Sequence, residues 1–90
     1  MEEQALTAFR ARDYDTATAR LYAALDREPQ RLSLKFWLGR VAMEREEWNA
    51  AEELFRQVLA QKPTSRATWY WLGRVYEATG RPEEAQEARA

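Results

Sequence analysis

The feature that most constrains this 90-residue chain is an internal repeat with a period of 34 residues. The segment at 36–41 reads Phe-Trp-Leu-Gly-Arg-Val, and the segment at 70–75 reads Tyr-Trp-Leu-Gly-Arg-Val, so five of six positions are identical. The same spacing relates three further sets of residues: Ala17, Ala51 and Ala85; Leu25 and Leu59; Pro29 and Pro63. A repeat of this length indicates one supersecondary unit that is stacked several times along the chain.

Each unit is predicted to be a pair of helices. Pro29 and Pro63 end helices because proline cannot continue the backbone hydrogen-bond ladder, and Asp13 and Asp15 are candidate N-caps. We predict helices over Glu3–Ala11, Asp15–Glu28, Leu32–Arg45, Trp48–Gln61, Ser65–Thr79 and Pro82–Arg89. The connections are short, so consecutive helices should pack antiparallel. No stretch has the alternation and turn chemistry of β-strands.

The repeated positions carry a resemblance to the tetratricopeptide repeat (TPR) family. Its pattern is Trp-x2-Leu-Gly-x2-Tyr, then Ala-x3-Phe, then Pro. The matching positions are Ala17 and Pro29 in the first unit; Leu38, Gly39, Ala51, Phe55 and Pro63 in the middle unit; and Trp69, Leu72, Gly73, Tyr76 and Ala85 in the last. The chain departs from the pattern at Lys35, Ala42 and Arg89, which stand where Trp, Tyr and Phe are usual.

The resemblance implies an all-α fold, a right-handed helical solenoid of antiparallel helix pairs with about five to six helices. It covers essentially the whole chain, so we expect a single domain over residues 1–90. Within it, residues 1–31 correspond to an incomplete first repeat, 32–65 to a full repeat and 66–90 to an incomplete last repeat.

Two glycines lie inside predicted helices, where each costs about 1 kcal/mol relative to alanine. We expect close approach of the paired helix to compensate, with Ala51 as the small partner of Gly39 and Ala85 as that of Gly73. On this account, replacing Gly39 by leucine unfolds the chain.

The first helix of each unit has more apolar positions than packing requires. In Leu32–Arg45, two stripes serve the packing: Leu38, Gly39 and Ala42 towards the paired helix, and Leu34, Leu38 and Val41 towards the preceding unit. The third side lines the concave surface of a solenoid, where such proteins bind partners. We expect Phe36 beside Tyr70, Trp37 beside Trp71 and Arg40 beside Arg74. The predicted partner-binding groove consists of Phe9, Phe36, Trp37, Arg40, Met43, Tyr70, Trp71 and Arg74.

The chemistry of this groove suits a peptide segment or amphipathic helix with apolar and acidic side chains. Tyr, Trp and Arg dominate binding energy at interfaces. Arg40 and Arg74 each follow a tryptophan by one turn, so each can stack on that ring and donate to a carboxylate or carbonyl. Two other interpretations stay open: the rings serve packing, and the arginines pair only with Glu44 and Glu77 of their own helices.

Composition excludes several other functions. A net charge of −1 provides no field for nucleic acid. Cysteine and histidine are absent, and no nucleophile–base arrangement is legible, so we expect no enzyme, no metal site and no cofactor. The acidic start does not resemble a signal peptide, and no apolar run approaches the ~18 residues of a membrane span. We therefore expect a cytoplasmic protein without membrane insertion.

The leading hypothesis is a non-enzymatic protein–protein interaction module, a scaffold or adaptor that binds another polypeptide. It predicts that the double substitution of Trp37 and Trp71 by alanine keeps the helical content and loses partner capture. The alternative is self-association into a homo-oligomer through the incomplete terminal repeats, because solenoids usually need polar caps at their ends. A segment of a larger multi-repeat protein would fit the same pattern.

Overall fold

The computed structural model describes residues 2–89, which form six α-helices and no strand. The helices are α1 (Glu2–Arg10), α2 (Tyr14–Arg27), α3 (Leu32–Glu44), α4 (Trp48–Gln61), α5 (Arg66–Ala78) and α6 (Pro82–Arg89). Every predicted helix is present, and each end lies within one residue of its expected position.

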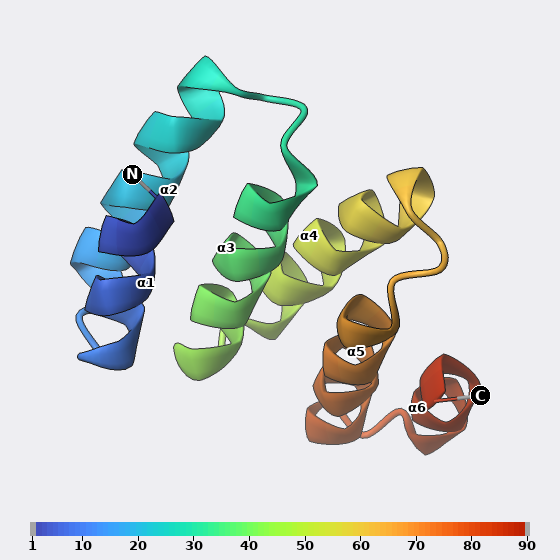
Figure 1. Ribbon diagram of the computed structural model, residues 1–90. Coiled ribbons are helices and arrows are strands. Elements are labelled where there is room, and N and C mark those ends of the chain that lie inside the picture. The colour runs from blue at the N-terminus through green and yellow to red at the C-terminus, as the bar shows by residue number, and fades with distance from the viewer. Residues whose placement is uncertain (1, 90) are drawn as a thin grey trace.

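The helices form three antiparallel pairs, α1 with α2, α3 with α4 and α5 with α6. The second helix of the first pair and that of the middle pair also pack on the first helix of the next pair. Figure 1 shows the pairs following one another across the molecule, with the two termini at opposite ends. The described chain measures 36 × 25 × 17 Å. This arrangement confirms the all-α solenoid of helix pairs.

The turn inside each pair repeats with the same period as the sequence. Arg12, Glu46 and Gly80 occupy it, with φ angles of 62°, 60° and 74°. In each turn, two backbone N–H groups satisfy carbonyls of the preceding helix; the N–H of Arg81, for example, donates to the carbonyl of Tyr76 at 2.8 Å. This is the Schellman motif, which favours glycine at the left-handed position. The third turn supplies glycine, whereas the first two hold non-glycine residues there.

The helix starts differ in how they are capped. Pro29 and Pro63 follow α2 and α4 as predicted. Of the two aspartates considered as caps, Asp13 serves α2 by accepting the N–H three residues later at 3.3 Å. Ser65 caps α5 in the same way at 3.4 Å. Arg31 holds the equivalent position before α3 and makes no side-chain cap.

The core consists of two clusters that meet at α3. One joins α1 and α2 to the side of α3 that faces them: Ala5, Ala8, Ala17, Leu21, Ala24, Leu34, Leu38 and Val41. The other joins α3 to α4, α5 and α6: Ala42, Met43, Ala51, Phe55, Leu59, Leu72, Val75, Tyr76, Ala85 and Ala88. Leu34 and Val41 thus face the preceding pair, as predicted. In residues 2–89, no helix is long and apolar enough to cross a membrane.

The two helical glycines have different neighbours. A Cβ added at Gly39 would lie 2.6 Å from the ring of Phe55, so the expected alanine partner is wrong and a phenylalanine closes this pair. The reason is that Phe55 lies one helical turn after Ala51 on α4, and its ring packs against Gly39. A Cβ at Gly73 would lie 3.5 Å from the Cβ of Ala88 and 3.6 Å from the backbone oxygen of Ala85. These contacts are ordinary, so only the middle pair requires glycine.

Candidate partner-binding surface

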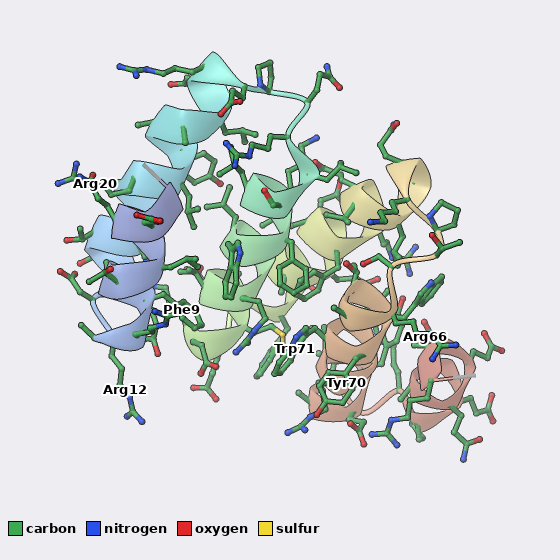
Figure 2. The ribbon with its side chains drawn as sticks, viewed as in Figure 1. Phe9, Arg12, Arg20, Arg66, Tyr70 and Trp71 are labelled. Carbon is green, nitrogen blue, oxygen red and sulfur yellow. The ribbon has the colours of Figure 1, made fainter. Side chains whose placement is uncertain are left out.

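Side chains from α1, α3 and α5 meet in a line that crosses all three helix pairs. The rings of Phe9 and Trp37 lie 5.6 Å apart, edge to face. The guanidinium carbon of Arg40 lies 5.3 Å from the ring centre of Phe9 and 3.7 Å from that of Trp71. Figure 2 shows Phe9 on the α3 side of α1 and Trp71 between α3 and α5. We call Phe9, Trp37, Arg40 and Trp71 the aromatic–arginine line.

Arg40 is the centre of this line, although its partner differs from the expected one. Its side chain is only 11% exposed and donates to Glu44 at 3.2 Å, which confirms the predicted pair. It stacks on Trp71 of the next unit rather than on Trp37. The ring of Trp37 is turned towards Phe9, and the long arginine side chain spans the space between two first helices. Contacts between these helices are therefore shifted by about one turn from the expected register.

Two residues assigned to the groove also contribute to the packing of the core. Met43 is buried in the second core cluster, so the expectation that it faces a partner is wrong. Phe36 packs within its own pair, with its ring 5.9 Å from that of Phe55, and also lies 5.4 Å from Trp37. The physical reason is that α3 lies between two other pairs, so its buried arc is wider than the two predicted stripes.

Tyr70 and Arg74 form the exposed end of the surface. Tyr70 is 47% exposed, and its ring lies 4.9 Å from that of Trp71. Arg74 donates to the Tyr70 hydroxyl at 3.2 Å, and its Nε lies 3.7 Å from Glu77. The expected pairing of Arg74 with Glu77 is confirmed, whereas the expected stacking on Trp71 is replaced by the bond to tyrosine. Tyr70 and Arg74 thus offer the most accessible polar and aromatic groups among the predicted groove residues.

A charged network on the other helix layer was not foreseen from the sequence. Glu52 of α4 binds Arg56 at 2.8 Å and Arg81 at the start of α6. Arg56 donates to the hydroxyl of Tyr76 at 3.0 Å, and Arg81 lies 4.6 Å over the same ring. The hydrogen bond from Arg81 lowers the pKa of Glu52, against the opposing effect of burial. The network fastens α4 to the last pair, and 29 residues of separation leave no local sequence signal for it.

The described residues contain no group of three or more acidic, histidine or cysteine side chains placed to hold a metal ion. The arrangement is therefore one of stacked rings and paired guanidiniums, whose chemistry is recognition by apolar contact, cation–π contact and hydrogen bonding.

Comparisons with known proteins agree with this architecture. The sequence profile of the tetratricopeptide repeat matches residues 8–67 and 42–88. Among solved structures, a mutant of the protein MamA is similar with a TM-score of 0.83 and 25% sequence identity, over 93% of this chain and 61% of that one. This chain therefore spans less than two thirds of that protein's length. No curated protein sequence matches significantly.

Proposed function

Because the chain belongs to the tetratricopeptide repeat family, whose repeats generally act as protein–protein interaction modules, we propose that it binds a peptide segment or helix of another polypeptide on the face of α1, α3 and α5. The observation that carries this proposal is the aromatic–arginine line, which continues to the exposed Tyr70 and Arg74. An extended ligand on this face would contact all three helix pairs.

The line supports binding because it is already ordered. Phe9, Trp37 and Trp71 are partly buried, and Arg40 is held by both stacking and Glu44. Side chains that are fixed before binding lose little rotamer freedom when a partner arrives, which favours affinity. Arginine and tryptophan are also the residue types enriched among binding hot spots.

The exposed end determines the chemistry of the partner. Arg74 is about half exposed, and its contact with Glu77 is long, so this pair contributes well under ~1 kcal/mol. A partner carboxylate can replace Glu77 at little cost and gain a charge-assisted hydrogen bond. The adjacent ring of Tyr70 provides apolar area beside it. An apolar side chain followed by an acidic one therefore fits this end of the surface.

The test uses substitutions that leave the core intact. Peptides are first selected on the wild-type protein from a random display library, and their binding to Tyr70→Ala/Arg74→Ala is then measured. We expect at least ten-fold weaker binding with unchanged helical content, because both side chains are exposed. Tyr22→Ala is the matched control, since Tyr22 is similarly exposed but lies on α2. Equal affinity in the double variant and the control would contradict the proposal.

Two further measurements sharpen the result. Trp37→Ala/Trp71→Ala should also lose binding, but each tryptophan packs against a core cluster, so its stability must be measured in parallel. Sedimentation of the wild type over a concentration range tests the alternative of self-association. A dimer that the Tyr70/Arg74 variant dissociates would assign this face to a second copy.

A further inference from the structure

A surface cavity of about 230 Å³ lies at the junction between the middle and last helix pairs. Figure 1 shows the end of α4 and the start of α5 on the same side of α3, where the two pairs meet. The lining includes residues from all three helices and from the connection between α4 and α5: Leu32, Phe36, Val58, Lys62, Ser65 and Ala67. Two successive repeat units therefore form this cavity together.

The cavity continues the face of the proposed groove. Ser33 and Ala67 both line it. Arg40 follows Ser33 by seven positions on α3, and Arg74 follows Ala67 by seven positions on α5. Seven residues make about two helical turns, so the members of each pair lie on one side of their helix, about 10 Å apart along the axis. The cavity thus lies on the groove face, nearer to the N-terminal ends of α3 and α5.

The floor of the cavity is apolar and ordered. Val58 is buried, and the ring of Phe36 lies 5.9 Å from that of Phe55. The hydroxyls of Ser65 and Thr68 are bonded to each other at 2.8 Å, so these side chains satisfy each other rather than a ligand. A cavity of about 150 Å³ with apolar walls can hold benzene, so this space is large enough for one apolar side chain.

The internal repeat shows which charge the cavity lacks. At the junction between the first and middle pairs, Glu28 and Arg31 stand at the positions equivalent to Lys62 and Ser65, and they form an ion pair at 2.9 Å. At the second junction, lysine replaces the glutamate and serine replaces the arginine. Within residues 2–89, the ammonium group of Lys62 makes no ion pair, and it is the one charged group among the described lining residues. The cavity is therefore complementary to an apolar group beside a carboxylate.

We propose that this cavity holds an apolar side chain of the partner polypeptide, while Lys62 binds a neighbouring carboxylate of the same segment. The ammonium group supplies a charge-assisted hydrogen bond, and the apolar floor removes the adjacent side chain from water. This inference rests on the proposed function, because it concerns the same face. It adds a second contact point about two helical turns from Arg74.

A second copy of the chain is the competing occupant, since the exposed Tyr22 is followed one turn later by Asp26 on α2. Insertion of Tyr22 into the cavity would join two different surfaces, which builds open chains of molecules unless the rotation happens to close. The commonest oligomers are closed dimers that use the same patch on both copies. A separate polypeptide is therefore the occupant to test first.

The charge is tested with the peptides that the wild-type protein selects from the random display library. Lys62→Glu reverses the charge at the cavity, so these peptides should bind it about five-fold weaker, the modest effect of an exposed ion pair. Replacing the acidic residue of a peptide by lysine should restore its affinity for Lys62→Glu. Lys35→Glu is the matched control, because it makes the same change at the other lysine, which does not line the cavity.

The shape is tested with Ala67→Leu, which places a larger side chain in the cavity itself. Because Ala67 is exposed, this variant should keep the helical content of the wild type and bind the peptides at least ten-fold weaker. Ala23→Leu is the matched control, since Ala23 is also exposed but lies on α2.

The inference is wrong if the peptides bind Lys62→Glu or Ala67→Leu as tightly as they bind the matched controls. If Tyr70→Ala/Arg74→Ala nevertheless loses binding, the proposed function stands without it. Weaker binding to both cavity variants but not to Tyr70→Ala/Arg74→Ala would support the cavity and contradict the exposed end of the groove. If the wild type captures no peptide, both proposals are wrong. Oligomers that Tyr22→Ala dissociates in sedimentation would assign the cavity to a second copy and overturn the inference.

Discussion

The first helices of the middle and last pairs share the same five residues, Trp-Leu-Gly-Arg-Val, yet the two pairs close differently. In the middle pair, Phe55 lies in contact with Gly39 and is fully buried. In the last pair, Arg89 replaces that ring, Gly73 has only ordinary contacts, and Tyr70 is left exposed. The residue that follows the shared segment by one helix therefore differs between the pairs: a buried ring in the middle pair and a charged side chain in the last.

The difference affects how stability is distributed along the chain. Full burial of a phenylalanine side chain contributes about 1.5–3 kcal/mol. Within the described part of α6, the buried side chains are those of Ala85 and Ala88. Regions with few buried apolar contacts open locally at lower free energy than the rest of a domain. The last pair combines this weaker packing with the exposed groups proposed for binding.

The largest effect is expected from Gly39→Leu. Because even a Cβ would lie 2.6 Å from the Phe55 ring, a leucine side chain forces α3 and α4 apart. Overpacking of this kind removes most of the roughly 5–15 kcal/mol that stabilises a typical domain, so the chain should be unfolded. Far-ultraviolet circular dichroism and thermal melting check this. A melting temperature near that of the wild type would refute the close-packing account.

Phe55→Ala is expected to destabilise the protein by about 3–5 kcal/mol, the usual loss for truncating a buried phenylalanine. Its repeat equivalent provides the comparison, because Arg89→Ala removes only an exposed ion pair with Glu77 and should change stability by less than ~1 kcal/mol. Urea denaturation of both variants measures the contrast. Similar losses of unfolding free energy at the two positions would show that Arg89 stabilises the last pair as much as Phe55 stabilises the middle pair.

Alanine at the two glycines should have opposite effects. Gly73→Ala places its Cβ at ordinary contact distance, so the higher helix propensity of alanine should stabilise the chain by about 1 kcal/mol. Gly39→Ala gains the same propensity but pushes against Phe55, and a net loss of about 1 kcal/mol is expected. Equilibrium unfolding in urea gives both signs. A destabilising Gly73→Ala would mean that the last pair also needs glycine.

The sequence predicted the helices well because its signals are local. Pro29, Pro63 and the 34-residue period place every helix end within one residue. The resemblance to the repeat family also identified Arg89 as the departure from phenylalanine. What the departure does was not predictable, because the position of a ring relative to a glycine on another helix depends on how the two helices cross.

Side-chain contacts between the repeat units were predicted less well than the bounds of the helices. The groove positions follow from helical periodicity, but a long side chain such as Arg40 reaches one ring or another according to the distance between helices and the rotamer of Trp37. Met43 was placed on a free face because periodicity does not reveal how wide an arc its neighbours cover. The Glu52–Arg81 pair joins residues that share neither a helix nor a repeat position.

The two junctions between pairs are expected to respond differently to acid. Glu52, 16% exposed, binds Arg81 at the second junction, whereas Asp15, 87% exposed, binds Arg45 at the first. The lowered pKa of Glu52 means that its stabilisation is complete above the ordinary value of 4.5 and is lost as the pH falls below it.

Glu52→Gln should therefore lower the melting temperature at pH 7 and flatten its dependence on pH below about 4.5, with an effect under ~1 kcal/mol because solvent screens the pair. Asp15→Asn is the matched control and should change less, since its carboxylate is more exposed. Thermal melts from about pH 3 to about pH 7 compare the two. Parallel curves for the wild type and Glu52→Gln would contradict the role assigned to this carboxylate.

The smallest effect concerns the N-terminal caps of α3 and α5. Here the last pair has the better-satisfied helix end, whereas the middle pair has the tighter packing. Ser65 caps α5, but Arg31 leaves α3 without a side-chain cap, so the more tightly packed pair has the less satisfied helix end. Arg31→Ser should add about 0.5 kcal/mol, the lower range for gaining a cap. Arg31→Ala separates this gain from the loss of the Arg31–Glu28 ion pair. If urea denaturation gives serine no advantage over alanine, the backbone at this end is satisfied by water, and capping does not distinguish the two pairs.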